Sequence, residues 1–159
     1  MHRTDLPLSY RLLLAAYRWR RGAQSAPAAL RVPVSQARVA LVSSAGLVAP
    51  GDTPFDLGIR GGDWSWRTIA TAVDPATLTV HHRSDAFDRA PLADDLNVVF
   101  PVGRLRTLVA TGEIGALAPR HLSFMGSITA PGRLIRESAP AAAAALVADD
   151  VDVALLVPV

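Results

Sequence analysis

Cysteine is absent from the 159 residues, and lysine is absent too, so all 16 basic residues are arginine. Without cysteine, disulfide bonds, thiolate metal sites and a thiol nucleophile are excluded within these residues. No uncharged stretch approaches the roughly 20 apolar residues that span a bilayer. Beyond the first 21 residues the arginines mix with the 14 acidic residues instead of clustering with aromatic side chains, so we expect no nucleic-acid partner.

The first 36 residues predict an amphipathic helix, over residues 6–21, and a connector rich in Ala, Pro, Ser and Gln. The apolar side chains at helical spacing are Leu6, Tyr10, Leu13, Leu14 and Tyr17. We expect this helix to pack on a sheet, although a membrane surface or a docking partner would also suit it. Arginines follow its apolar residues and no clean cleavage site succeeds it, which disfavours a secretory signal and favours the cytoplasm.

Residues 37–159 predict an α/β domain with a Rossmann-like or flavodoxin-like, mostly parallel sheet and flanking helices. An apolar run over residues 39–42 ends abruptly in Ser43 and Ser44, as a buried parallel strand does where its loop begins. Loops at that carboxyl edge of a parallel sheet bind ligands. Residues 78–82 predict a second strand.

The later part of the chain predicts helices and a final strand. Residues 97–101 are expected to form a third short strand or an extended lead-in to a helix that stops at Gly112. Ser138 is the expected N-cap of an alanine-rich helix that tolerates Pro140 in its first turn. The last nine residues, VDVALLVPV, then predict a strand buried on both faces.

A glycine-rich stretch over residues 46–66 predicts a long ordered loop, and uncovered loops of that length are often functional. Trp64 and Trp66 lie on the same side of the chain if it is extended there. They could wall a pocket, but packing on the core is the favoured interpretation.

Three groups of polar residues could carry chemistry: His81, His82, Asp85 and Asp88; then Arg120 and His121; then Glu137 and Ser138. A histidine beside a carboxylate can orient an ammonium group, exchange protons or bind a metal ion. No histidine spacing typical of a metal site occurs, so we predict none. Arg120 could clamp a substrate carboxylate or pair with an acid of this chain. Glu137 and Ser138 suit helix-dipole and capping roles.

Several blocks follow one another from residue 37 to the end: ARVALVSSAG, GDTPFDLG with GGDWSWRTI, HHRSDAFD, DLNVVFPVGRLRTLVATGEIGALAPRHLSFMG, LIRESAP and VDVALLVPV. In content and order they resemble the selenoprotein B family of glycine, sarcosine, betaine and D-proline reductases. The block from Asp95 to Gly126 is too long to arise from composition alone.

The resemblance implies an oxidoreductase that reductively cleaves a carbon–nitrogen bond of glycine, betaine, sarcosine, D-proline or a related small amine, with a dithiol as reductant. It also implies a reactive selenocysteine or cysteine just after Val159. Because the UGA codon of selenocysteine is easily taken for a stop, we expect a truncated chain that is inactive alone and whose sheet is incomplete at its C-terminal edge. No other cofactor is evident.

The matched blocks suggest His82, Asp85 and His121 as catalytic residues, and Ser43, Ser44 and Arg120 as substrate-binding residues. The two serines end the first strand, where they could hold an anion. By resemblance, the partners are other reductase subunits and a thioredoxin-like or dithiol reductant, and an unfinished sheet edge favours an oligomer. The alternatives are a non-catalytic small-molecule-binding or regulatory module and, more weakly, a histidine–carboxylate metallohydrolase.

Overall fold

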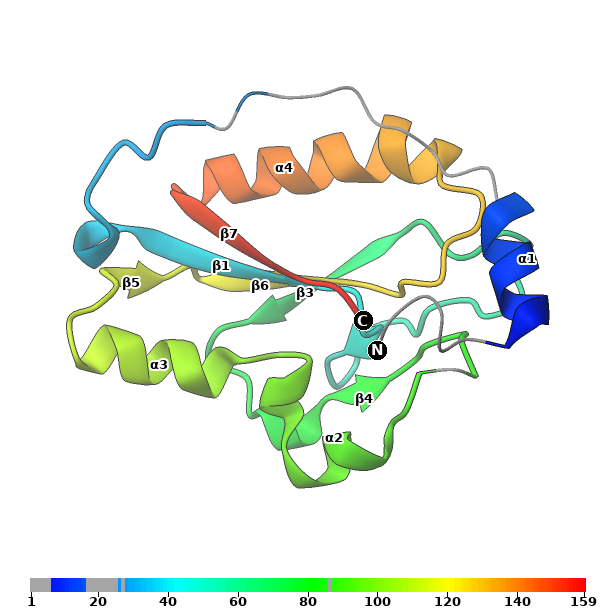
Figure 1. The fold of residues 1–159 in the computed structure, drawn as a ribbon. Helices are drawn as coiled ribbons and strands as arrows, with labels where there is room; N and C mark the ends of the chain where they lie inside the picture. The colour runs from blue at the N-terminus through cyan, green and yellow to red at the C-terminus, as the bar shows by residue number, and fades with distance from the viewer. Residues whose placement is uncertain (1–6, 17–25, 27, 86) are drawn as a thin grey trace.

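A five-stranded sheet forms the centre of the protein in the computed structural model, which describes residues 7–16, 26, 28–85 and 87–159 (Figure 1). β1 (Arg38–Ser43) pairs in parallel with β7 (Val153–Val157) on one side. On its other side it pairs in parallel first with β5 (Ala116–Leu117) and then with β6 (Arg120–Phe124). β3 (Trp66–Ala70) adds to β6 in antiparallel orientation.

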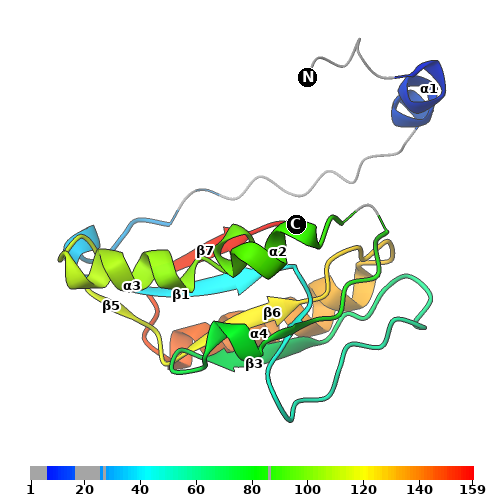
Figure 2. The same cartoon turned by 90° about the horizontal axis from the view of Figure 1, so that it is seen from below.

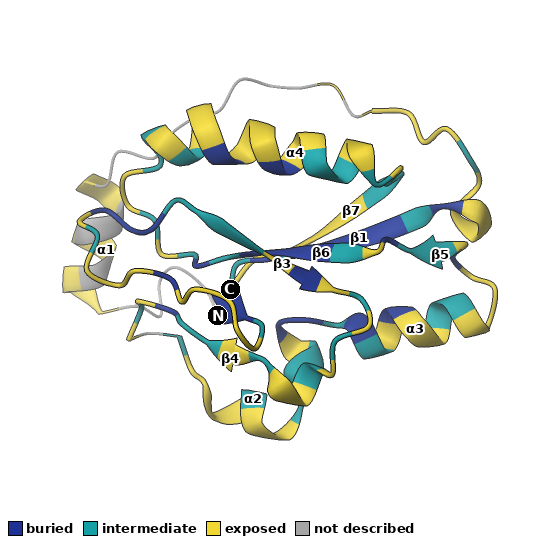
Figure 3. Cartoon of the chain, turned by 180° about the vertical axis from the view of Figure 1, so that it is seen from behind, coloured by how far each residue is buried: buried dark blue, intermediate teal, exposed yellow. Residues whose placement is uncertain are grey.

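Helices cover both faces of this sheet. α3 (Val102–Ala110) and the short α2 (Ala90–Asp94) lie on one face, and α4 (Ala139–Ala148) lies on the other (Figures 1 and 3). The predicted α/β class, with a mostly parallel sheet and flanking helices, is confirmed, and the arrangement is consistent with a Rossmann-like or flavodoxin-like fold.

The hydrophobic core lies mainly between the sheet and α3. Alternation along β1 directs Val39 and Leu41 into this core, where they join Phe100 and Leu105 of the helical side. α4, by contrast, is largely exposed, and Ala142 is its only buried residue in the part of the chain that the structure describes. The α3 face is therefore the well-packed one.

Two of the predicted strands differ from the expectation. The strand predicted over residues 78–82 is shortened to β4 (Thr79–Val80), which pairs with β2 (Leu47–Val48) in a separate antiparallel ladder. Residues 97–101 form no strand. A 3₁₀ turn (Leu96–Val98) precedes α3 instead, because the Asp95 carboxylate accepts the N–H of Asn97 and the side-chain Oδ1 of Asn97 accepts the N–H of Gly103. The helix stop at Gly112 is confirmed, with φ of 76°.

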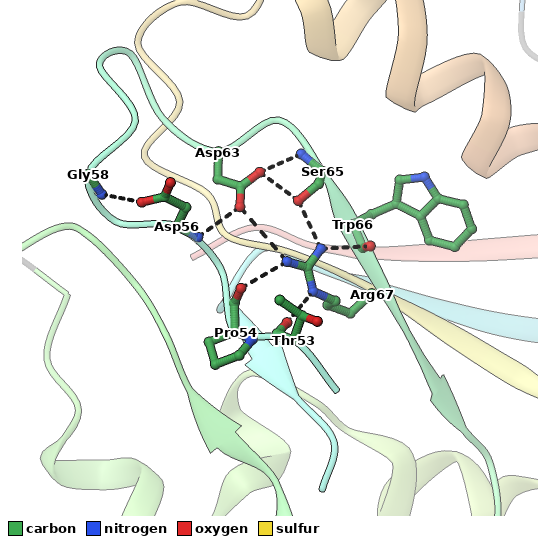
Figure 4. A network of polar contacts seen from close by, with 8 residues as sticks. All are labelled: Thr53, Pro54, Asp56, Gly58, Asp63, Ser65, Trp66 and Arg67. Atoms are coloured by element: carbon green, nitrogen blue, oxygen red, sulfur yellow. Dashed lines mark hydrogen bonds and ion pairs between the residues drawn. The ribbon is translucent and has the colours of Figure 1, made fainter. Parts of the chain in front are cut away.

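The long loop before β3 is held by one half-buried arginine (Figure 4). Arg67 donates to the carbonyl oxygens of Thr53 and Pro54, at 2.6 and 3.0 Å, and lies 3.9 Å from the Asp63 carboxylate. Burial opposes ionisation of Asp63, but hydrogen bonds from Ser65 and the Asp56 N–H, with the charge of Arg67, lower its pKa overall. Most of the predicted ordered loop is confirmed, and its order comes from this network.

The N-terminal helix was predicted to pack on the sheet through a stripe of apolar side chains. α1 (Leu8–Ala16) is drawn apart from the sheet (Figure 2), and Leu8 and Leu12, which do not belong to that stripe, are 66% and 62% exposed. The stripe side chains of Tyr10, Leu13 and Leu14 lie outside what the structure describes. Residues 6 and 17–21 of the predicted helix lie outside the described residues. An amphipathic pattern predicts the helix but does not identify what covers its apolar side.

Ser138 is not an N-cap. Its backbone is helical, and the chain already winds through a π-helical segment (Leu134–Ser138) before α4 begins. Pro140 explains the wide turn, because proline has no N–H and its ring clashes with the carbonyl four residues earlier in a regular α-helix. The proline therefore lies inside a longer helix instead of in a first turn.

β7 is not buried on both faces as predicted. It is an edge strand: among the described residues only β1 pairs with it, and Leu156 is 68% exposed. The apolar sequence predicted the strand correctly but not its neighbours, which depend on the sheet around it.

Candidate functional site

The carboxyl ends of three parallel strands meet at one edge of the sheet. Ser44, just after β1, donates its N–H to the Val157 carbonyl at 3.1 Å, and its hydroxyl accepts the N–H of Val159 at 2.9 Å. Two residues later, the N–H of Gly46 donates to the Phe124 carbonyl of β6 at 2.8 Å. The loop after β1 is thus tied to both neighbouring strands.

His82 approaches this edge from the end of the β4 segment. It is 3% exposed, and its Nδ1 accepts the N–H of Ser84 at 3.1 Å. That hydrogen bond assigns the ring proton to Nε2, which is buried and has no hydrogen-bond partner among the residues that the structure describes. Burial, with the charge of Arg89, lowers the pKa of His82, so the ring is neutral at pH 7.

Gly126 brings His82 and Ser44 together. A Cβ atom at Gly126 would lie 2.5 Å from the Ser44 carbonyl oxygen and 2.8 Å from Nε2 of His82. The residue also has φ of 70°, which other residues rarely adopt. Only glycine permits this close approach of the β1 loop and the imidazole.

A cavity of about 290 Å³ opens beside these residues. Its lining comprises His82, Ser84, Phe87, Asp88, Ser127 and Val159. The His82 and Phe87 rings lie 4.6 Å apart, and one oxygen of Asp88 accepts the N–H of Ala90 at 2.9 Å. An apolar ring, an imidazole and an acidic residue therefore border one small space.

A larger, almost wholly apolar cavity of about 460 Å³ lies between the sheet edge and the helix that leads into α4. Ser44 and Gly126 line it, together with Phe124, Leu134 and Leu156. Ser127 lines the smaller cavity, so Gly126 and Ser127 border one cavity each. The C-terminal residues from β7 onward line both cavities, Leu156 the apolar one and Val159 the smaller one, whose lining is mixed.

Ser43, Arg120 and Asp85 have other surroundings. The hydroxyl of buried Ser43 donates to the Val99 carbonyl at 2.8 Å and accepts the Ala45 N–H at 3.2 Å. Arg120 begins β6, at the opposite edge of the sheet, and binds the Asp149 carboxylate through Nε and Nη2 at 2.6 and 2.9 Å. It thus pairs with an acid of this chain. Asp85 is exposed and lines a neighbouring hollow.

His121 lies inside the sheet and is fully buried. The ladder beside β1 is interrupted at Pro119, which has no N–H, and Nδ1 of His121 accepts the Leu41 N–H at 3.1 Å. Nε2 lies 3.1 Å from the Thr71 hydroxyl, which itself donates to the Ala118 carbonyl. Burial, with a smaller contribution from Arg106, lowers the pKa of His121 to about 4. These contacts give the neutral His121 ring a structural role, because it joins β6 to β1 and to Thr71.

Comparison with known proteins decides the family. The family model for glycine/sarcosine/betaine reductase selenoprotein B matches residues 21–158. The chain belongs to this selenoprotein B family. D-proline reductase subunit gamma of Acetoanaerobium sticklandii is 35% identical over 118 residues, which cover 74% of this chain and 47% of the relative. The chain therefore spans about half the length of that relative, and no solved structure matches it.

The site residues predicted from sequence fall into two sets. Ser44 and His82 meet at the carboxyl edge, whereas the side chains of Ser43, Asp85, Arg120 and His121 do not join them. Sequence reasoning missed Gly126, Phe87 and Ser127. Gly126 ends the matched block SFMG, and its place directly after an apolar run was the available signal.

Two further observations concern metal ions and membranes. Within the described ranges, no group of three His, Asp or Glu side chains is arranged to hold a metal ion. No helix in the described part of the chain is both long and apolar enough to cross a bilayer.

Proposed function

We propose that this chain forms the substrate-facing part of a reductase subunit that cleaves a carbon–nitrogen bond of a small amino-acid-like amine, with a dithiol as reductant. Family membership supports the reaction type. One observation supports the site: β7 leads to Val159 beside Ser44 and His82, whose buried Nε2–H has no partner in the described part of the chain. An unpaired buried donor beside a cavity is costly unless a ligand accepts its hydrogen bond.

The overall reaction balances with the dithiol alone. One carbon–nitrogen bond breaks, and the carbon and the nitrogen each gain a hydrogen. The two electrons and two protons come from the dithiol, which becomes a disulfide. A selenocysteine or cysteine just after Val159 would supply the nucleophile for this chemistry.

The described residues bind and orient the amine. Neutral His82 donates its Nε2–H to the substrate carboxylate, while the Asp88 carboxylate and the Phe87 ring face the ammonium group. A volume of about 290 Å³ suits a substrate of a few heavy atoms. Asp85, exposed at the neighbouring hollow, remains a candidate for proton transfer. Other reductase subunits and a thioredoxin-like protein or small dithiol are the proposed partners.

The codon after Val159 in the genomic sequence tests the reactive residue. We expect UGA, followed by an open frame that encodes further α/β sequence. Another terminator with no frame behind it contradicts the proposed reductase.

Calorimetry on the 159-residue chain tests the pocket separately, with D-proline, glycine, sarcosine and betaine as ligands. His82→Ala should weaken binding at least tenfold, because a hydrogen bond to a charged group contributes about 1.5–3 kcal/mol. His81→Ala, outside the cavity lining, is the matched control. Binding that survives in His82→Ala rejects the assignment of His82. Ligand binding by a protein whose gene has neither a UGA nor a cysteine codon after Val159 would instead identify a non-catalytic binding module.

A further inference from the structure

A third cavity, of about 340 Å³, lies where the loop before β3 meets the start of the helix that leads into α4. Arg60, Trp64, Arg133 and Arg136 contribute its side chains, and glycine backbone forms much of the remaining wall. No feature of the proposed reductase site uses these residues. The concentration of three guanidinium groups around one small space requires an explanation.

The charge of this cavity is only partly neutralised. Arg133 binds the Glu137 carboxylate bidentately, with Nε and Nη2 at 3.1 and 2.9 Å. Among the described residues, neither Arg60 nor Arg136 forms an ion pair. Arg136 lies close enough to Glu137 to help lower the pKa of that carboxyl, but a single carboxylate faces three guanidinium groups. An excess of two positive charges therefore remains at the cavity, and solvent or a bound anion must offset it.

One side of the cavity is held in place before any ligand arrives. The Arg133 guanidinium lies 3.6 Å from the centroid of the Trp64 ring, a cation–π contact. The N–H of Ala130 donates to the Gly61 carbonyl at 3.0 Å, and a Cβ at Gly62 would lie 2.9 Å from Cα of Ile128. Such pre-organisation reduces the entropy lost on binding.

We propose that this cavity binds a dianionic oxyanion of the phosphate class, either free or as a monoester. Arg60 and Arg136 donate to its oxygens, because the planar guanidinium matches the geometry of phosphate. The positive end of the helix that begins at the cavity adds to the attraction. A dianion neutralises both excess charges, whereas a monocarboxylate leaves one of them.

Calorimetric titration of the full 159-residue chain with inorganic phosphate tests this assignment, with sodium acetate at equal ionic strength as the reference. We expect saturable phosphate binding, and at least tenfold weaker binding in the Arg60→Ala/Arg136→Ala double variant. Arg104→Ala is the matched control, since Arg104 is an exposed arginine paired with Asp95 on another surface. It should bind phosphate as the wild type does.

Three outcomes overturn the proposal: phosphate heats no larger than those of acetate, binding that does not saturate, or a double variant that binds as the wild type does. Circular dichroism confirms that each variant is folded, and Arg136→Gln replaces the double variant if that does not fold. A parallel titration with phenyl phosphate separates the sources. Tighter binding than that of phosphate identifies a monoester site, and equal or weaker binding identifies a site for free phosphate. These results are independent of the His82 and codon tests.

Discussion

At the scale of single residues, Gly126 determines whether the carboxyl edge can assemble. This edge requires both the positive φ of Gly126 and its lack of a side chain, because Ser44 and His82 occupy the space where a Cβ would lie. Gly112 offers a natural comparison. It has a similar φ of 76°, but no atom lies within 4 Å of a Cβ built there.

Gly126→Ala should therefore destabilise the protein far more than Gly112→Ala. The left-handed conformation alone costs alanine roughly 1 kcal/mol, which is the whole effect expected at Gly112. At Gly126 the clash with the Ser44 carbonyl raises the total to roughly 3 kcal/mol or more. Urea unfolding followed by circular dichroism measures both values. Equal losses in the two variants would contradict the close approach at Gly126.

His121 predicts a specific dependence of stability on pH. Its pKa is about 4 in the folded protein and near 6.5 in the unfolded chain. As the pH falls through 6.5, the His121 imidazole becomes protonated in the unfolded chain but stays neutral in the folded protein. Stability is therefore lost between pH 6.5 and about 4, by roughly 3 kcal/mol at most.

The free energy of unfolding at pH 7 and at pH 4.5, compared in the wild type and in His121→Asn, isolates this contribution from that of the carboxylates. The wild type should lose more stability than the variant over this interval. Where the variant does not fold, NMR titration of the His121 ring in the wild type replaces the comparison. A His121 imidazole that titrates near 6.5 would contradict the conclusion that this ring is buried and neutral.

At the scale of elements, the sequence predicts those whose side chains follow a simple period. β1 and α3 have clear apolar patterns, and Gly112 marks the helix end. β3 and β6 were missed because Trp66, Arg67, Arg120 and His121 resemble loop residues. Their polar groups are satisfied by partners far along the chain, such as Asp149 for Arg120, which local sequence does not reveal.

The same reason limits prediction of the site. The position of Ser44 was predictable because polar residues that follow a parallel strand lie at its carboxyl end, whereas His82 reaches this edge from the separate β2–β4 ladder. The sequence did not distinguish His82 from His121, since both are histidines within matched blocks. Among the described residues, one ring nitrogen of His82 has no partner, whereas both nitrogens of His121 lie within hydrogen-bonding distance of neighbours. That difference arises from tertiary contacts.

At the scale of the whole molecule, the two faces of the sheet are unequal. The α3 face closes over a continuous core, whereas the α4 face leaves an apolar cavity of about 460 Å³ that reaches β7. β7 has no charged residue and no proline over Val153–Val157, so it lacks the usual features that prevent edge strands from pairing. Leu156 is exposed there and lines the cavity.

We therefore predict that the 159-residue chain self-associates through β7. Light scattering after size exclusion, at about 10–100 µM protein, should give a mass above 16.8 kDa that falls with dilution. Leu156→Lys should restore the monomer, because a charged side chain on an edge strand disfavours pairing with a second copy. Val147→Lys is the matched control: Val147 is similarly exposed but lies on α4. A wild type that stays monomeric throughout this range, or an equal effect of both substitutions, would show that β7 is not the associating surface.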